Sequence, residues 1–255
     1  MAARRRTGVG ALLLRGLVAG LLAGLLAGGF AYVAGEPSVQ QAIQVEEAQH
    51  RAVDAIVPPH QDAQPLVSRK VQRAGLILAT SLAGLALGGL FALTFAAIRG
   101  RLGRGLGDWG ISTRMAAVLF ATVGLVPFLK YPANPPGIGD PATIDSRTGS
   151  YLAMVAISLL ALVVGWRVAR ALGERVGAPL RQLAGIGSYG ATVAIGWLLL
   201  PERERVPDLY PATLLWEFRV ASLGTQAVLW GALGAGFGLL VLRSQARAAS
   251  VSQPA

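Results

Sequence analysis

The sequence predicts an all-α, polytopic integral membrane protein with about six transmembrane helices. Hydrophobic residues make up 53% of the 255-residue chain and charged residues only 14%, an apolar content above that of soluble domains. The apolar residues form long continuous runs and not the alternation expected of a β-barrel. Because lipid offers the backbone no hydrogen bonds, continuous apolar runs of this kind are expected to cross the membrane as helices.

Six apolar runs are long enough to be spans, since a helix needs about 20 residues to cross the hydrocarbon core. The predicted spans cover residues 11–34, 74–98, 111–129, 151–168, 180–200 and 220–242. The third and fourth runs are the shortest. All six are expected to belong to a single membrane domain.

The distribution of charge predicts that both termini are cytoplasmic. With this orientation, the inner loops hold thirteen basic residues and two acids, whereas the outer loops hold nine basic residues and eleven acids. An excess of arginine and lysine on the cytoplasmic side is the usual topology signal. The formal net charge of +10 is therefore explained without a nucleic-acid partner.

The first apolar run carries a glycine repeat that predicts close helix packing. Gly16, Gly20, Gly24 and Gly28 recur every fourth residue and therefore share one helix face. A cleavable signal peptide is the alternative interpretation, because three arginines precede the run and small residues follow it. The run exceeds the usual length of a signal peptide's apolar region, so we expect it to be retained as a span.

The outer loop of residues 35–73 is predicted to contain an interfacial helix over residues 38–57. Ser38 and Gln41 form a capping box, and Pro37 is expected to block extension of the helix backwards. We expect a candidate metal site on this helix, formed by Glu46 and His50 with Asp54 at its edge. Oxygen and nitrogen ligands suit cobalt, nickel or zinc. The alternative is a structural hydrogen bond between the Glu46 and His50 side chains.

Residues 130–150 are predicted to form a rigid outer loop, because four prolines fix the backbone and remove amide donors. Lys130 and Tyr131 are expected to anchor the third span at the membrane interface. Lys130, Tyr131, Asn134 and Asp140 are also candidates for a substrate path or vestibule. The alternative for the loop is a lid that packs the outer face.

A polar row in the last predicted span extends this candidate vestibule. Arg219, Ser222 and Gln226 share one helix face, and polar groups at membrane depth either bridge helices or line a substrate path. Both interpretations of this row remain open.

Several chemistries are excluded or disfavoured. Cysteine is absent, which excludes disulfides and thiolate sites, and no phosphate-binding loop or metalloprotease motif occurs. We therefore expect no enzyme activity, no catalytic residues and no firmly bound cofactor.

Four long sequence blocks resemble the CbtA family of predicted cobalt transporter subunits. The blocks are RGLVAGLLAGLLAGGFAYVAGEPSVQQAI at residues 15–43, VSRKVQRAGL followed by GGLFAL, VPFLKYPANPPGIGDPATIDSRT, and YPATLLWEFRVASLGTQAVLW at residues 210–230. The resemblance covers nearly the whole chain. Members often carry a histidine-rich stretch in the first outer loop, where this chain has only His50 and His60.

The resemblance implies a multi-pass subunit of a cobalt uptake system in a bacterial inner membrane, linked to cobalamin synthesis. It also implies a small single-span partner of the CbtB type that bears histidines, with cobalt as the substrate; a homo-oligomer is a further expectation. The alternative function is a non-transporting membrane scaffold that assembles with a partner through the glycine face.

Overall fold

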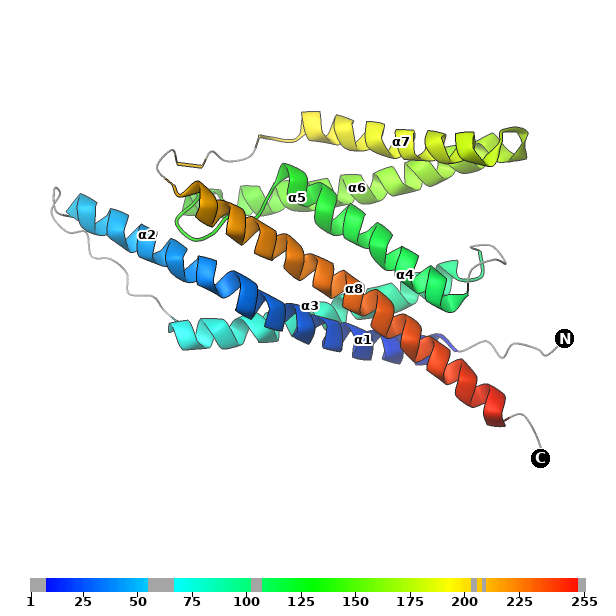
Figure 1. The fold of residues 1–255 in the computed structure, drawn as a ribbon. Helices are drawn as coiled ribbons and strands as arrows, with labels where there is room; N and C mark the ends of the chain where they lie inside the picture. The colour runs from blue at the N-terminus through cyan, green and yellow to red at the C-terminus, as the bar shows by residue number, and fades with distance from the viewer. Residues whose placement is uncertain (1–7, 55–66, 102–106, 203–205, 208–209, 252–255) are drawn as a thin grey trace. The chain divides into compact units, whose positions relative to one another are not determined.

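The structure is a computed structural model that describes residues 8–54, 67–101, 107–202, 206–207 and 210–251 (Figure 1). These residues contain helices and no β-strand. The α-helices are α1 (Val9–Phe30), α2 (Glu36–Asp54), α3 (Arg69–Ile98), α4 (Asp108–Leu119), α5 (Val126–Lys130), α6 (Ile144–Leu172), α7 (Ala178–Leu199) and α8 (Ala212–Val251). There are also two π-helical turns, η1 (Ala31–Gly35) and η2 (Phe120–Leu125), and two 3-10 turns, η3 (Pro141–Thr143) and η4 (Gly173–Arg175).

Five helical segments of the described chain are long and apolar enough to cross a membrane. They are Val9–Gln49, Arg69–Ile98, Asp108–Lys130, Ile144–Leu172 and Ala212–Arg247. The prediction of a polytopic, all-helical membrane protein is therefore confirmed. Helix α7 corresponds to the fifth predicted span but is not among these five, since it contains several polar residues.

The first predicted span and the predicted interfacial helix are one uninterrupted helix from residue 9 to residue 54 (Figure 1). The expectation that Pro37 starts a new helix is wrong. The π turn η1 lies just before Pro37, and there the Glu36 amide donates to the carbonyl of Ala31, five residues back. A proline ring normally clashes with the carbonyl four residues earlier, and the wider turn relieves this clash. Residues 55–57 of the predicted helix lie outside the described residues.

The third predicted span also contains a π turn just before a proline. The π turn η2 immediately precedes α5, whose second residue is Pro127. The carbonyl that Pro127 leaves without its usual helical partner belongs to Val123, and the Tyr151 hydroxyl lies 3.5 Å from that oxygen. Neighbouring helices commonly satisfy backbone groups that proline frees inside a membrane.

The chain divides into two compact units. The first comprises Met1–Leu119 with Val220–Ala255, and the second comprises Phe120–Arg219. In the first unit, α1 lies directly against α3 along the glycine face. A Cβ atom placed on Gly16 would lie 2.3 Å from the carbonyl oxygen of Gly88, and one on Gly20 would lie 2.1 Å from that of Gly84. Only glycine permits two helix backbones to approach so closely.

The rest of the first unit is built around the part of α8 that follows residue 219. The ring of Phe237 meets Phe91 and Phe95 of α3 edge-on, at centroid distances of 5.4 and 5.0 Å. The buried Ser112 hydroxyl of α4 donates to the Gly234 carbonyl of α8 over 2.6 Å. Aromatic packing and one interhelical hydrogen bond therefore fix this part of α8 to α3 and α4.

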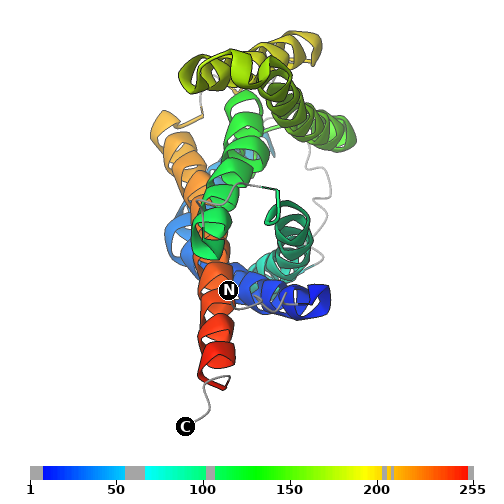
Figure 2. The ribbon, with the colours of Figure 1, turned by 90° about the vertical axis from the view of Figure 1, so that its right-hand side faces the viewer.

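The second unit is dominated by the pair α6 and α7, which lie against each other in both views (Figures 1 and 2). A Cβ on Gly165 would lie 2.6 Å from the Gly185 carbonyl oxygen. The buried Ser158 hydroxyl also lies 2.9 Å from the Tyr189 hydroxyl across the interface. This pair therefore combines one close glycine contact with a polar link.

Candidate functional site

The proline loop is shorter in the structure than the sequence predicts. It runs from Tyr131 to Asp140, because the 3-10 turn η3 and then α6 occupy residues 141–150. Gly137 and Gly139 both have positive φ angles, of 79° and 106°, which other residues rarely adopt. The loop thus contains prolines that restrict its backbone and two glycines whose backbone conformation is left-handed.

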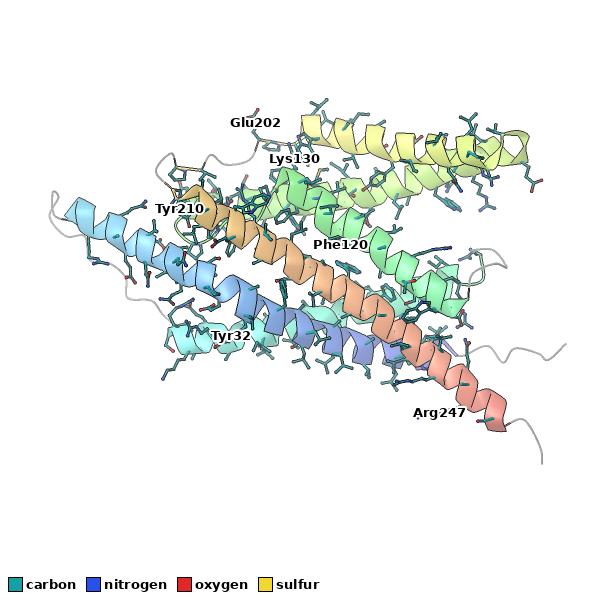
Figure 3. The ribbon with its side chains drawn as sticks, in the orientation of Figure 1. Tyr32, Phe120, Lys130, Glu202, Tyr210 and Arg247 are labelled. Carbon is teal, nitrogen blue, oxygen red and sulfur yellow. The ribbon has the colours of Figure 1, made fainter. Side chains whose placement is uncertain are left out.

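Lys130, at the carboxyl end of α5, is buried with 6% of its surface exposed (Figure 3). Its ammonium donates to the Trp197 carbonyl of α7 over 2.7 Å and lies 5.3 and 5.4 Å from the ring centres of Tyr131 and Trp197. The interpretation of Lys130 as a snorkelling anchor is therefore wrong. The Trp197 carbonyl is among the last four of α7, which have no partner within the helix. A cation there also matches the negative end of the helix dipole.

Tyr131 makes a second link to the end of α7. Its hydroxyl donates to the Pro201 carbonyl over 2.6 Å, just after α7 ends. Burial raises the pKa of the Tyr131 phenol above its ordinary value, and the Ser150 hydroxyl partly offsets this by hydrogen bonding. Lys130 and Tyr131 together fasten the end of α5 to the end of α7.

Arg219, in the first turns of α8, holds the middle of the loop. Its Nε donates to the Ala133 carbonyl over 3.3 Å, and its Nη2 donates to Asn134 Oδ1 over 2.9 Å. Arg219 therefore links α8 to the proline loop, and the two roles expected for it, bridging helices or lining a substrate path, stay predictions.

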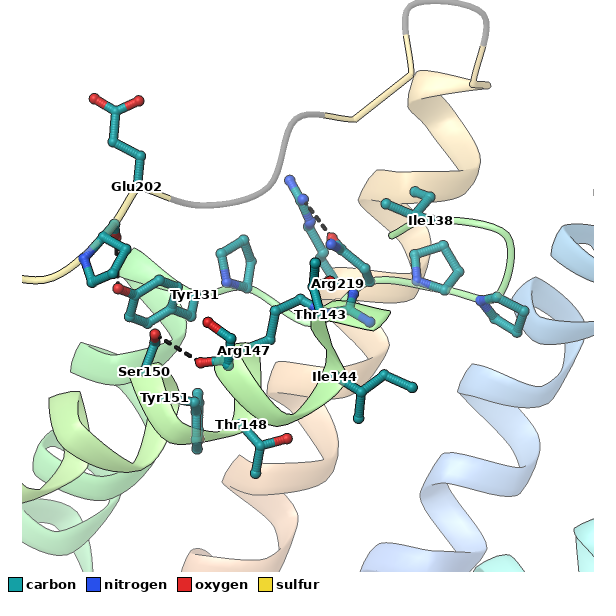
Figure 4. Close-up of a pocket in the computed structure, with 16 residues that line it drawn as sticks. Tyr131, Ile138, Thr143, Ile144, Arg147, Thr148, Ser150, Tyr151, Glu202 and Arg219 are labelled. Carbon is teal, nitrogen blue, oxygen red and sulfur yellow. Dashed lines mark hydrogen bonds between the residues drawn. The ribbon is translucent and has the colours of Figure 1, made fainter. Parts of the chain in front are cut away.

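An open pocket of about 700 Å³ lies beside the loop, within the second unit (Figure 4). Its lining includes Tyr131, Asn134, Arg147, Tyr151, Glu202 and Arg219. We call it the proline-loop pocket. Among the described residues that line it, two are arginines and one is an acid, while several hydroxyls come from the start of α6.

Three of the predicted vestibule residues, Tyr131, Asn134 and Arg219, line this pocket. Lys130 and Asp140 do not. The Asp140 carboxylate instead accepts a hydrogen bond from the Ala142 amide over 2.8 Å and caps the turn η3. Ser222 and Gln226 are half-buried on α8 in the first unit and are not among the lining residues.

The candidate metal ligands Glu46, His50 and Asp54 all belong to helix α2. Glu46 is half-buried, whereas the side chains of His50 and Asp54 lie outside the described part of the structure. Within the described residues, no three histidine, aspartate or glutamate side chains gather closely enough to hold a metal ion. The proposed ligand set therefore stays a prediction.

Sequence reasoning missed a charged cluster in the first unit. Glu36 accepts hydrogen bonds from Arg69 over 2.5 Å and from Arg73 over 2.6 Å, and Arg73 also donates to Gln40 over 3.3 Å. The Glu36 side chain is only 12% exposed. The available signal was an acid at the end of the first apolar run and two arginines, four residues apart, before the second.

The sequence analysis also did not predict that Arg147 and Glu202 line the pocket. Arg147 lies in the predicted loop, and the beginning of α6 turns it toward the pocket lining. Its only signal was its position among the hydroxyl residues of the sequence TIDSRTGS.

The helices and the pocket together define a multi-pass, helical membrane protein with an open pocket at the ends of its candidate membrane-spanning helices. The chain belongs to the CbtA family: the family model, described as a probable cobalt transporter subunit, matches residues 9–242. This description points to a transporter subunit and away from an enzyme. Comparison with curated proteins and with solved structures gives no match.

Proposed function

We propose that this chain is the membrane subunit of a cobalt uptake system that supplies cobalamin synthesis across a bacterial inner membrane. The observation that carries this proposal is the match of the CbtA family model to residues 9–242, nearly the full length of the chain. Five apolar helices of sufficient length agree with a transport function in the membrane. The chain is a transporter component and has no catalytic role of its own.

In the proposed topology both termini are cytoplasmic and α7 forms a sixth span. The excess of basic residues in the loops that would then face the cytoplasm supports this orientation. The acid-rich outer loops would raise the local concentration of divalent cations, an effect that salt weakens.

Within this function, Glu46, His50 and Asp54 are proposed as the first cobalt ligands. They are spaced four residues apart on helix α2 and therefore share one helix face. Replacing Glu46 and His50 together by alanine is expected to weaken cobalt binding and uptake. Glu47→Ala is the matched control, because Glu47 is exposed and its side chain pairs with Arg51 at 3.9 Å. Wild-type binding and uptake in the double variant would disprove the ligand set.

The proposed partner is a small single-span subunit that carries histidines. In this chain the glycine face of α1 is already occupied by α3, so it is not available for a partner. The scaffold alternative therefore cannot rely on the glycine face for its assembly. A partner or a second copy has to bind another face.

Uptake of radiolabelled cobalt tests the proposed function directly. Cells that carry the partner are compared with and without this chain, and a parallel measurement with nickel defines selectivity. Uptake that depends on the chain is expected. Equal uptake in both strains would overturn the proposal.

A further inference from the structure

We propose that the proline-loop pocket binds an oxyanion: a phosphate or carboxylate group carried by a soluble molecule or by a lipid headgroup. This site is distinct from the cobalt ligands proposed on α2. The residues that form it are the same whichever metal the protein transports.

The charge of the lining favours an anion over a bare metal cation. Among the described residues around the pocket, Arg147 and Arg219 outnumber the single acid Glu202. Guanidinium groups stay protonated at physiological pH and match the geometry of phosphate and carboxylate oxygens. A divalent metal such as cobalt prefers carboxylate or imidazole ligands, and Glu202 alone supplies one here.

The position of Arg147 at the start of α6 also favours anion binding. Arg147 lies in the first turn of α6, a helix of 29 residues that begins at Ile144. The amino end of a helix presents unpaired backbone amides and a partial positive charge. Thr143, Ser146 and Thr148 come from the same end of α6 and also line the pocket. The Thr143 hydroxyl already donates to the Asp140 carbonyl over 2.7 Å, so the hydroxyls of Ser146 and Thr148 are the ones that can donate to an oxyanion.

The second arginine is held in a fixed orientation. Two of its five N–H donors go to the Ala133 carbonyl and to Asn134 Oδ1, which sets the plane of the guanidinium at the pocket wall. The loop that supplies these acceptors contains three prolines and is tied to α7 through Lys130 and Tyr131. A prearranged wall lowers the entropy that a ligand loses on binding.

The size and position of the pocket indicate the kind of ligand. A volume of about 700 Å³ exceeds what a lone phosphate fills and lies in the range of small-molecule sites. The pocket is built where α5 ends, α6 begins and α7 ends, so it lies at the ends of membrane-spanning helices. Both a phospholipid headgroup and a soluble carboxylate or phosphate compound can reach such a place.

Thermal unfolding of the purified full-length protein in a neutral detergent tests the proposal. The probes are phosphatidylglycerol, inorganic phosphate and citrate, with phosphatidylcholine as the zwitterionic control. We expect at least one of the three anions to raise the melting temperature in a saturable way. A shift with phosphatidylglycerol alone identifies a lipid headgroup, whereas a shift with phosphate or citrate identifies a soluble anion.

Two variants on the same helix assign the effect to the pocket. Arg147→Gln is expected to weaken the anion affinity by about tenfold or more, since a charge-assisted hydrogen bond is lost. Arg170→Gln is the control, because Arg170 lies near the other end of α6 and stacks on Trp166 at 5.2 Å. Circular dichroism confirms that each variant is folded, and Arg147→Lys, which keeps the charge, is expected to retain part of the affinity. No shift with any of the three anions, or equal shifts in wild type and Arg147→Gln, would overturn the proposal.

Discussion

The two helix pairs of this protein are held together in different ways. In the first unit, α1 and α3 touch through their backbones: Gly16 faces Gly88 and Gly20 faces Gly84, with no room for a Cβ atom. In the second unit, α6 and α7 share one such glycine contact, between Gly165 and Gly185. The remaining contacts of α7 include several polar ones.

These polar contacts occur along α7 and at its end. Ser158 and Tyr189 meet in the middle of the pair, and Lys130 and Tyr131 bind the carbonyls of Trp197 and Pro201 where the helix finishes. The strongly apolar pair α1–α3 is joined along its length by backbone contact, and its charged link, from Glu36 to Arg69 and Arg73, lies at one end, where α1 continues into α2. The less apolar α7 depends on hydrogen bonds that have no competitor in lipid.

The largest expected effect is on the backbone contact of the first pair. In Gly20→Ala, the new Cβ would lie 2.1 Å from the Gly84 carbonyl oxygen, so the two helices must separate. Overpacking of this kind costs about 1–3 kcal/mol or more. We expect a marked loss of folded protein, measured as the yield and melting temperature of the detergent-solubilised chain.

Gly29→Ala is the matched control for this variant. Gly29 lies on the same helix, but nothing lies within 4 Å of its added Cβ. It should behave as wild type or slightly better, because alanine favours helices. Equal behaviour of the Gly20 and Gly29 variants would show that close backbone contact does not hold the first pair.

The next largest effect concerns the end of α7. Lys130→Met removes the ammonium that binds the Trp197 carbonyl and leaves this part-buried acceptor without that partner. Such a loss costs about 1–3 kcal/mol. The melting temperature of Lys130→Met should fall clearly below that of Lys70→Met, in which the replaced lysine is exposed on α3. Equal melting temperatures of the two variants would show that the contact between Lys130 and the Trp197 carbonyl of α7 does not stabilise the protein.

The sequence predicts the helix contacts of the first pair better than those of the second. The period of four in Gly16 to Gly28 determines one helix face, so a close helix contact could be predicted without a partner in view. The partner could not, because Gly84 and Gly88 are only two of the chain's 33 glycines. The apolar runs likewise predicted the helices, which burial in lipid enforces.

The errors arose where tertiary structure overrides a local rule. Pro37 stops a helix in water, but here a π turn accommodates it, and no residue type encodes a π turn. Lys130 sits at a helix end, where a lysine usually reaches toward headgroups. It is buried instead, because the end of α7, distant in sequence, offers a carbonyl and two aromatic rings surround the ammonium. The pocket could not be predicted for the same reason, because its lining comes from segments that are far apart in the sequence.

A smaller effect is expected from the polar link in the middle of the second pair. Ser158→Ala removes the 2.9 Å contact with the Tyr189 hydroxyl. Hydrogen bonds between membrane helices contribute about 0.6 kcal/mol on average, so a small drop in unfolding free energy is expected. Ser188→Ala is the control, because the Ser188 hydroxyl bonds the Ala184 carbonyl of its own helix. A double-mutant cycle with Tyr189→Phe measures the coupling, and zero coupling would contradict a stabilising link.

The smallest effect is a pH dependence at Tyr131, the second attachment of α7. Burial raises the pKa of its phenol above the ordinary value of 10.0, so the folded protein holds this proton more tightly than the unfolded chain. Below pH 10 both states are protonated, and the hydrogen bond to Pro201 contributes fully. As pH rises past about 10, the unfolded chain loses the proton first, so unfolding becomes more favourable. The melting-temperature advantage of wild type over Tyr131→Phe should therefore shrink in this alkaline range, whereas other titrating groups affect both proteins alike. An advantage that stays constant from pH 8 to 11, measured in steps of about half a unit, would show that the Tyr131 proton is not linked to the folding of the second pair.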